Sequence, residues 1–412
     1  MRILMLANKV PFPPKDGGAF ATLNMALGLA ESGAEVTLLA MSTPKHPSNE
    51  KDFPESILKQ IKVHTVFVNT ELSPFKALHN LIFSKHAYNA QRFISKQFGK
   101  TLETLLVQNS YDIVQLEGLY IYPYLDIIRK HFSGKIVLRA HNVEHEIWQR
   151  NASIQSNRFK RWYFNHLAHR VKNAEVNLLK GIDLLIPISL RDQQMLEQLG
   201  YSGQSFTSPT GYCLSNRREM DENFEPLSVF HLGGLDWIPN QEGLFWFLDN
   251  CWPHVLTSVP DAKFYIAGRN ATQSFIKKIN DYQNTVFVGE VEDSGEFMRS
   301  KSVMVVPLLS GSGMRIKIVE GMALGKAIVS TSIGAEGIDI ENEKHLIIAD
   351  TPYLMAKSIV KLLINKKEIL RIGENAQVFV NQNLDNSILT QNLIDFFKQI
   401  QNESNSLISR QI

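Results

Sequence analysis

The sequence predicts an α/β protein made of two parallel-sheet domains. Three observations support this prediction: the length of 412 residues, the short apolar runs that recur along the chain, and the longer mixed segments between those runs. Domains of about 150 to 200 residues are usual, so the length allows two of them. Runs that are apolar at consecutive positions are typical of parallel strands covered by helices on both faces. We therefore expect two Rossmann-like domains that face each other across a cleft.

The expected strands fall into two sets. In the first half of the chain they lie at residues 3–7, 36–40, 63–68, 113–116, 136–139 and 184–188. In the second half they lie at residues 228–232, 263–267, 285–288, 303–307, 327–330 and 346–348. These runs are rich in Val, Ile and Leu, and the segments between them are long enough for helices.

A polar stretch rich in turn residues, 200–225, separates the two sets of strands. Such stretches are typical of linkers between domains. We place the first domain at residues 1–205 and the second at residues 206–382. The remaining segment, 383–412, is expected to form a terminal helix followed by a tail. Its apolar residues recur at helical spacing, and they are Leu389, Leu393, Phe396, Phe397 and Ile400.

Composition and charge exclude several classes of protein. With 44% hydrophobic and 20% charged residues, the chain resembles ordinary soluble globular proteins. The 43 Lys and Arg residues nearly balance 41 Asp and Glu residues, so no overall field favours nucleic acid. Two cysteines are too few for a disulfide framework, and no apolar run approaches the roughly 18 residues that span a bilayer. We expect a cytoplasmic protein, with the first residues forming a strand rather than a signal peptide.

The most informative segment follows the expected strand that ends near Pro307. It contains Gly311, Ser312 and Gly313, whose backbone would allow close approach of a ligand at the start of the next helix. Arg315 and Lys317 come next, near the first turn of that helix. Cations oppose the helix dipole there, so an anionic ligand such as a diphosphate would explain them. A flexible loop with solvated charges is the alternative that composition leaves open.

Two familiar phosphate-binding motifs do not fit this segment. Ile316 stands where a dinucleotide fingerprint needs its last glycine. Residues 321–327 have the wrong spacing for a nucleotide-triphosphate loop, and Ala327 stands where that loop needs Ser or Thr.

The segment resembles the donor-site signature of glycosyltransferases with the GT-B fold, in the large retaining family numbered four (glycosyl transferases group 1). The shared pattern is Gly-x-Gly-x-Arg-x-Lys-x-x-Glu-x-Met-Ala-x-Gly. Further similarity lies at residues 16–18, 33–37, 233–240, 266–268 and 286–289. The resemblance thus extends over both domains. It implies that the terminal helix crosses back to brace the first domain.

The resemblance implies a nucleotide-sugar donor bound by the second domain. Glu320 would bind the ribose, and Val288 and Gly289 would border the nucleobase. The loop from Gly311 to Gly313 would face the sugar and the phosphates. The other expected donor-binding residues are glycines that follow strands, namely Gly17, Gly18, Gly233 and Gly234.

The chain departs from the family pattern at two places. Ser312 stands where many relatives carry Glu, and residues 235–237 replace an Arg and a Lys that hold the diphosphate. We infer that Arg315 and Lys317 neutralise the phosphates instead. The sequence contains no Asp-x-Asp, which argues against a metal-bridged diphosphate. We expect no metal and no cofactor, with the nucleotide diphosphate sugar acting as co-substrate.

His141 follows an expected strand and begins the pattern His-x-x-Glu-His. This is the inverted zincin motif, which would make His141 and His145 zinc ligands. Zinc hydrolases need that motif on a helix with a distant third ligand, whereas His141 is expected at the end of a strand. The resemblance instead places His141 in the cleft, near the acceptor and the donor sugar, as a positioning or proton-handling group. A structural histidine is the other alternative. Glu117 ends a neighbouring strand and is assigned either to the cleft or to the surface.

Residues 158–172 combine basic and aromatic side chains. The apolar stripe within and after them is predicted to face the core, and it comprises Phe164, Leu167, Val171, Ala174 and Leu178. The basic side suits peripheral contact with anionic lipid headgroups at the inner face of the membrane. RNA is disfavoured because no nucleic-acid module surrounds the segment.

We therefore expect an enzyme that moves a sugar from a UDP or GDP sugar to a hydroxyl acceptor, in cell-envelope polysaccharide or lipid-linked glycan synthesis. The resemblance implies retention of the anomeric configuration. Two alternatives stay open: a catalytically silent nucleotide-sugar-binding protein, and a nucleotide-sugar epimerase of the same fold. The epimerase would need further acid and base groups, while Ser312 and the missing Arg and Lys pair keep the silent binder open as an alternative.

Overall fold

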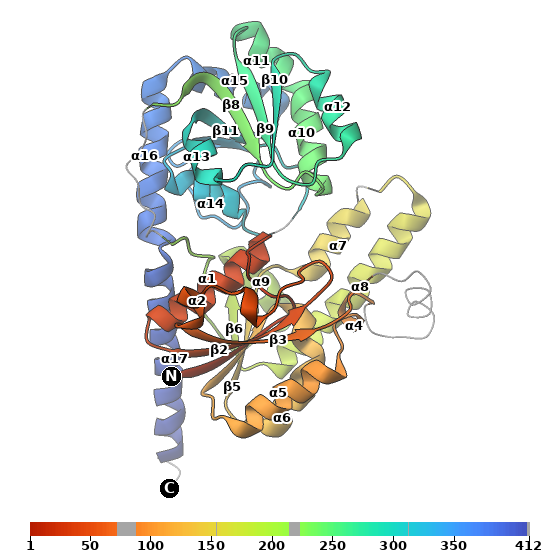
Figure 1. Cartoon of the computed structure of the whole chain (residues 1–412), viewed down its shortest axis with the longest axis vertical. Helices are drawn as coiled ribbons and strands as arrows, with labels where there is room; N and C mark the ends of the chain where they lie inside the picture. The colour runs from red at the N-terminus through yellow and green to blue at the C-terminus, as the bar shows by residue number, and fades with distance from the viewer. Residues whose placement is uncertain (72–87, 154, 214–222, 312, 410–412) are drawn as a thin grey trace. The chain divides into compact units, whose positions relative to one another are not determined.

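The structure is a computed structural model of the chain (Figure 1). It describes residues 1–71, 88–153, 155–213, 223–311 and 313–409, with side chains as far as residue 403. The chain forms two compact units: unit 1 is Met1–Gly211 with Asn386–Ile412, and unit 2 is Tyr212–Asp385. The boundaries expected from sequence, after residues 205 and 382, lie a few residues earlier.

Unit 1 is built on a sheet in which the described residues form seven strands, in the order β3-β2-β1-β4-β5-β6-β7. All pairings between them are parallel. The six strands predicted in this half are confirmed. The additional strand, β7, has only two residues and gives no pattern in the sequence. The strands are β1 (Arg2–Ala7), β2 (Glu35–Ser42), β3 (Ile61–Phe67), β4 (Ile113–Glu117), β5 (Lys135–Ala140), β6 (Leu184–Pro187) and β7 (Gln204–Ser205).

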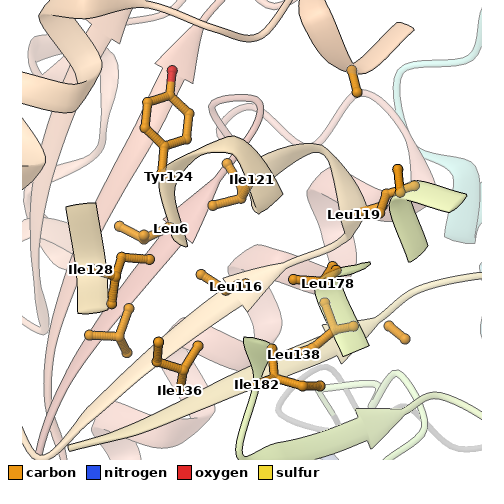
Figure 2. Close-up of a cluster of buried hydrophobic side chains, with 14 of the residues drawn as sticks. Leu6, Leu116, Leu119, Ile121, Tyr124, Ile128, Ile136, Leu138, Leu178 and Ile182 are labelled. Carbon is orange, nitrogen blue, oxygen red and sulfur yellow. The ribbon is translucent and has the colours of Figure 1, made fainter. Parts of the chain in front are cut away.

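Helices pack on both faces of this sheet because successive residues of each buried strand point in opposite directions. In β1, Leu4 and Leu6 join one hydrophobic cluster, whereas Ile3 and Met5 join another. Figure 2 shows part of the first cluster, with Leu6 and Leu116 from neighbouring strands. The helices of unit 1 are α1 (Gly17–Glu31), α2 (Glu55–Leu58), α4 (Tyr88–Gln91), α5 (Lys96–Gln108), α6 (Leu125–His131), α7 (Glu144–Ser153), α8 (Arg158–Gly181), α9 (Leu190–Gln198) and α17 (Asn386–Ser409), with 3-10 turns η1 (Glu50–Asp52) and η2 (Leu119–Tyr124).

The terminal helix α17 belongs to unit 1 and packs along α1. Its residues Leu393 and Phe397 are buried in the cluster that contains Ile3. Close approach of the two helices depends on Gly28, where an added Cβ would lie 2.5 Å from Nδ2 of Asn386. The helix therefore completes the hydrophobic core of the first domain although it comes from the far end of the sequence.

The long helix α8 changes character along its length. Leu167, Val171, Ala174 and Leu178 are buried, as predicted, and Phe164 is half-buried. The first turn differs, because the residues of 158–162 are all exposed there. No helix in the described part of the chain is long and apolar enough to cross a bilayer.

Unit 2 repeats the parallel-sheet architecture. Its described residues form six parallel strands in the order β10-β9-β8-β11-β12-β13, which confirms the strands predicted in the second half. The strands are β8 (Glu225–Leu232), β9 (Lys263–Ala267), β10 (Thr285–Gly289), β11 (Lys301–Val306), β12 (Ala327–Ser330) and β13 (Ile347–Ile348). The helices are α10 (Ile238–Asn250), α11 (Trp252–Ser258), α12 (Gln273–Asn280), α13 (Ser294–Arg299), α14 (Ile316–Ala323), α15 (Pro352–Leu363) and α16 (Lys366–Asn383).

Each sheet has one point where the direction of winding reverses. In unit 1 this point lies between β1 and β4, and in unit 2 it lies between β8 and β11. Ligands of open α/β sheets bind beyond the carboxyl ends of the strands at such points. Most of the residues selected from the sequence follow these strands or their neighbours.

Candidate functional site

The glycine loop selected from the sequence connects β11 to α14 in unit 2. Gly311 and Gly313 have φ angles of 120° and 81°, a region that favours glycine. A Cβ on Gly311 would lie 2.6 Å from Nη2 of Arg315 and 3.2 Å from the ring of Trp237. Both glycines are therefore required by the backbone of this loop. Ser312 lies outside the described residues.

Arg315 folds back onto the same loop. Its Nη1 atom donates a hydrogen bond of 2.8 Å to the carbonyl oxygen of Gly313. The guanidinium carbon lies 5.6 Å from the ring centroid of Trp237, within the range of a cation–π contact. Arg315 is buried and immediately precedes α14. The structure thus gives it a role in shaping the loop, beside any role toward a ligand.

Lys317 is the second residue of α14, and its side chain reaches the end of β8. The Nζ atom lies 3.1 Å from Oδ1 of Asn240 and 3.5 Å from Nε2 of His231. Gly233 leaves space for this cluster, since an added Cβ there would lie 3.1 Å from Nζ. Burial and the positive charge of Arg315 lower the pKa of Lys317 to about 7. The amine is therefore only about half charged at pH 7, and an anion that enters the site would favour its charged form.

Glu320 lies one turn further along α14. Its Oε1 atom accepts a hydrogen bond of 2.8 Å from the hydroxyl of Ser294 at the start of α13. Burial raises the pKa of Glu320, and the negative charge of Asp293 acts in the same direction. The carboxylate is thus placed in a partly dry site and already accepts one hydroxyl hydrogen bond.

Glycines also open the carboxyl ends of β8, β9 and β10. An added Cβ on Gly268 would lie 1.8 Å from the carbonyl oxygen of Gly233, so these two strand ends approach closely. Gly268 N donates to the Gly289 carbonyl over 2.7 Å, and Gly289 has a φ of 83°. Val288 beside it is exposed, and Gly234 accepts a hydrogen bond from Asn240. This edge of unit 2 offers backbone groups rather than bulky side chains.

Gly17 and Gly18 belong to unit 1, at the start of α1. Asp16 caps this helix by accepting from the backbone of Ala19, and it also pairs with Lys9 at 2.6 Å. Burial opposes ionisation of Asp16, but its bonds to His46 and Lys9 lower the pKa of the carboxyl overall. An added Cβ on Gly18 would lie 2.9 Å from Nζ of Lys9. Gly18 therefore gives Lys9 room after the end of β1.

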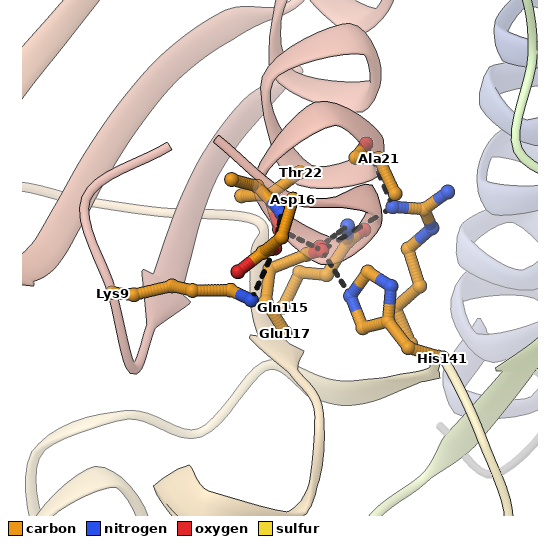
Figure 3. Close-up of polar contacts among 9 residues, drawn as sticks. Lys9, Asp16, Ala21, Thr22, Gln115, Glu117 and His141 are labelled. Carbon is orange, nitrogen blue, oxygen red and sulfur yellow. Dashed lines mark hydrogen bonds and ion pairs between the residues drawn. The ribbon is translucent and has the colours of Figure 1, made fainter. Parts of the chain in front are cut away.

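His141 and Glu117 meet at the ends of β5 and β4 (Figure 3). The His141 Nε2 atom lies 2.9 Å from Oε2 of Glu117, and Nη1 of Arg139 lies 3.3 Å from the same oxygen. Thr22 and Gln115 donate further hydrogen bonds to this carboxylate. The surface alternative for Glu117 is wrong, because the residue is only 3% exposed.

The environment of Glu117 determines the state of the histidine. Burial alone would raise the pKa of Glu117, but the Arg139 guanidinium and His141 lower it to about 2. An ionised carboxylate only accepts hydrogen bonds, so His141 must donate from Nε2. Burial lowers the pKa of His141, which keeps the ring neutral at neutral pH. The neutral ring therefore carries its lone pair on Nδ1.

The second histidine of the zincin-like pattern has a different partner. His145 Nδ1 lies 2.6 Å from Oε2 of Glu175, a residue of α8 that also accepts from the backbone of Glu144 at 2.7 Å. His145 and Glu175 thus tie the start of α7 to α8. Within the described ranges, no group of three or more His, Cys, Asp or Glu residues is arranged to hold a metal ion.

A pocket beside His141 contains a second titratable group. Gly118, His141, Asn142 and Glu144 are among its lining residues. Tyr120 donates a hydrogen bond of 3.0 Å to Glu144. Burial and the neighbouring charge of Glu175 raise the pKa of Glu144 to about 7. Glu144 was not selected from the sequence, because in the His-x-x-Glu-His pattern only the two histidines were considered as functional groups.

His231, Asn240 and Arg139 were also missed. His231 and Arg139 are polar residues inside otherwise apolar strands, and both are fully or almost fully buried. A buried polar side chain in a parallel strand needs a polar partner, which is the signal that could have selected them. Asn240 lies in the segment 233–240 that resembles the family, but no role was assigned to it from the sequence.

Comparisons with known proteins agree with this architecture. Residues 226–365 match the family described as Glycosyl transferases group 1. An uncharacterized 44.6 kDa protein in the cps region of Klebsiella pneumoniae is 25% identical over 396 residues, which cover 93% of this chain and 96% of that protein. A phosphatidyl-myo-inositol mannosyltransferase of Mycobacterium leprae is 28% identical over 149 residues, 35% of this chain and 38% of that protein.

Solved structures share the fold over nearly the whole chain. Sucrose-phosphate synthase from Thermosynechococcus elongatus has a TM-score of 0.73 at 14% identity, covering 98% of this chain and all 100% of that one. HepE of Anabaena, solved in complex with UDP, has a TM-score of 0.69 at 15% identity, covering 97% and 100% of the two chains. The group 1 family match over residues 226–365 and the two parallel-sheet units together support a glycosyltransferase with the GT-B fold.

Proposed function

We propose that the protein transfers a sugar from a nucleoside diphosphate sugar to a hydroxyl group of a cell-envelope glycan or its lipid-linked precursor. The observation that carries this proposal is the arrangement on α14. A glycine loop leads into the helix, Arg315 and Lys317 lie at its start, and the buried Glu320 lies one turn further. Cations and backbone amides at a helix N-terminus suit a diphosphate, and a carboxylate suits sugar hydroxyls.

The same groups would assist departure of the nucleoside diphosphate. Cleavage of the bond to the anomeric carbon leaves negative charge on the diphosphate, and preorganised positive groups stabilise that charge in a site with little water. Arg315 supplies one cation, and Lys317 supplies a second when it is protonated. In the described residues, the polar side-chain contacts of Lys317 are with Asn240 and His231 rather than with a carboxylate. We therefore propose transfer without a metal ion.

The acceptor is assigned to unit 1. His141 offers the lone pair of Nδ1 to an acceptor hydroxyl, because Glu117 engages Nε2. In this proposal His141 positions the hydroxyl or takes up its proton while the donor is held by unit 2. The sugar keeps its anomeric configuration, as the family resemblance implies.

The cellular context is proposed from the relatives. One is described as a protein of the cps region and another as a phosphatidyl-myo-inositol mannosyltransferase. Both descriptions suit a polymer or lipid of the cell envelope as acceptor.

A peripheral membrane contact fits the exposed first turn of α8. Phe159 is 85% exposed and Trp162 is 59% exposed. Arg158, Lys160 and Arg161 are exposed on the same turn. Apolar rings with basic neighbours bind the interface of anionic membranes. We name residues 158–162 the basic aromatic turn.

The proposal is tested by binding and turnover with one preparation of the full chain. Titration with UDP and GDP shows which nucleotide binds, and incubation with the matching nucleotide sugars plus an envelope lipid extract shows whether the donor is consumed. Binding with consumption in the presence of EDTA supports transfer without a metal ion. Binding without consumption identifies the silent binder instead.

A further inference from the structure

Three elements of unit 2 meet at the ammonium group of Lys317. Asn240, from the first turn of α10, places Oδ1 3.1 Å from Nζ. The orientation of this amide is fixed because its Nδ2 atom donates a 2.8 Å hydrogen bond to the carbonyl oxygen of Gly234. The oxygen, rather than the nitrogen, therefore faces the ammonium group.

His231, from the end of β8, is the second side chain in contact with the amine of Lys317. Its Nδ1 atom lies 3.1 Å from the carbonyl oxygen of Val305. A carbonyl only accepts, so Nδ1 carries the hydrogen and Nε2 presents its lone pair to Nζ at 3.5 Å. Burial and the charge of Lys317 lower the pKa of His231 well below its usual value, so the ring stays neutral.

The groups around Lys317 do not neutralise the positive charge that its amine carries when it is protonated. Arg315 is the cation that acts on it, His231 is neutral, and no carboxylate in the described part of the chain forms an ion pair with Nζ. Glu320 on the same helix bonds to Ser294 instead. Two neutral acceptors thus position an ammonium group whose charge has no local counter-ion. Burying a charge in this way is unfavourable unless a partner arrives.

We propose that His231 and Asn240 are positioning residues that hold Lys317 for the donor diphosphate, and that diphosphate binding is coupled to uptake of one proton by Nζ. The inference rests on the proposed nucleotide-sugar function. The proton comes from solvent when the diphosphate binds and returns to solvent when the diphosphate leaves. Because His231 and Asn240 are neutral, the site becomes positive mainly when an anion occupies it.

The protonation state of free Lys317 sets the pH range of this coupling. Its pKa of about 7 leaves the amine mostly neutral at pH 8, and a neighbouring diphosphate favours the ammonium form. Uptake should approach one proton at pH 8, be near half a proton at pH 7, and vanish for Lys317 at pH 6. Affinity should accordingly fall by up to tenfold per pH unit above pH 7.

The test is calorimetric titration of the full chain with UDP and with GDP at pH 8, in HEPES and in Tris. The two buffers differ in ionisation enthalpy, so the difference in heat reports protons taken up. The terminal phosphate of either probe is already ionised at this pH, so uptake reports on the protein. We expect close to one proton per bound nucleotide, and none for uridine or guanosine.

Variants separate the role of His231 and Asn240 from the role of the charge on Lys317. Lys317→Arg is always charged, so it should bind the nucleotide without proton uptake. Asn240→Asp places a carboxylate beside the ammonium group, which should abolish uptake and weaken diphosphate binding at least tenfold while leaving nucleoside binding unchanged. His231→Phe removes one neutral acceptor, so uptake at pH 7 should rise toward one proton. His254→Phe, the same change at an exposed position of α11, is the control and should behave as wild type.

The outcomes distinguish this inference from the function on which it rests. If wild type binds neither UDP nor GDP, the proposed function and the inference are overturned together. Binding with the same heat in both buffers at pH 8, or uptake that persists in Lys317→Arg, would overturn the inference alone.

Discussion

The Nε2 atom of His141 lies 2.9 Å from Oε2 of Glu117, at the carboxyl ends of two neighbouring strands. Arg139 and His141 keep the pKa of that carboxylate at about 2 against the effect of burial. The pair fixes the orientation and the tautomer of the imidazole before any substrate binds. Nε2 of His141 is thus engaged by Glu117, and Nδ1 is the nitrogen that can accept from a ligand.

His141→Ala should reduce sugar transfer strongly while leaving the affinity for UDP and GDP unchanged, because the nucleotide is assigned to unit 2. His141→Gln distinguishes two roles, since its amide can still donate to Glu117 and accept from a hydroxyl but cannot take a proton. Turnover of both variants from pH 5.5 to 9 is the measurement. If His141 is a base, both variants lose activity and the wild-type rate falls at acid pH, where the ring becomes charged. Wild-type rates in both variants would make His141 a structural residue.

Glu117→Gln should destabilise unit 1. The folded pKa of Glu117, about 2, lies below its usual value of 4.5, so the ionised carboxylate stabilises the fold at neutral pH. That contribution is about 3 kcal/mol above pH 4.5 and is lost as the pH falls through 2. The substitution also leaves the buried Arg139 without its counter-ion.

Urea unfolding at pH 7 and at pH 3 measures this effect, which should be smaller at pH 3. Glu55→Gln, at an exposed ion pair on α2, is the matched control and should change stability by less than about 1 kcal/mol. An equal and small effect of both substitutions at pH 7 would contradict the account of the Glu117 network.

Glu144→Gln should change the stability of the protein in the opposite direction to Glu117→Gln. The folded pKa of Glu144, about 7, lies above its usual value of 4.5, so ionisation destabilises the fold. This penalty is absent below pH 4.5, grows as the pH rises to 7, and is complete above it. The amide should therefore stabilise the protein by roughly 1 to 3 kcal/mol at pH 8 and have little effect at pH 4.5.

Glu146→Gln provides a control on the same helix. Arg191 and Arg150 lower the pKa of Glu146 against the effect of burial, so removing its charge should destabilise rather than stabilise at pH 8. The measurement is the melting temperature of Glu144→Gln and of Glu146→Gln at pH 8 and at pH 4.5. Equal signs for the two substitutions at pH 8 would refute the assignment for Glu144.

Reversing the three basic charges of the basic aromatic turn should weaken binding to vesicles that contain anionic lipid. Electrostatic attraction to such vesicles is screened by salt, so wild-type flotation should also fall as salt is raised. The control is a protein in which the charges of Lys277, Lys357 and Lys367 are reversed. These residues are exposed in unit 2, so the net charge changes by the same amount. Loss of flotation in both proteins, or none in either, would show that the turn does not bind the membrane.

Consecutive apolar residues were sufficient to predict the strands of both sheets, because strands covered on both faces must be apolar at every position. Glycine and charge patterns likewise selected the loop before α14, whereas His141 was selected by its position after a strand and by the family resemblance. The partners of these residues could not be predicted. The contacts of Glu117 with Arg139, and of Lys317 with His231, join residues on different elements that are far apart in the sequence. They depend on strand order, which the local pattern does not specify.

The proposed sugar transfer depends above all on binding of the donor by α14. The most direct measurement is release of nucleoside diphosphate by wild type and by Glu320→Ala. Each protein is incubated with a panel of UDP and GDP sugars and a lipid acceptor extract, and the released nucleotide is measured by chromatography. Loss of hydrogen bonds to a charged group weakens an interaction by about 1.5 to 3 kcal/mol, or roughly tenfold to a hundredfold. We predict that one nucleotide sugar is consumed by wild type with transfer of its sugar, and that Glu320→Ala, with an unchanged melting temperature, is slower by that factor. Equal rates for the two proteins, or a donor that binds and stays intact, would contradict the claim.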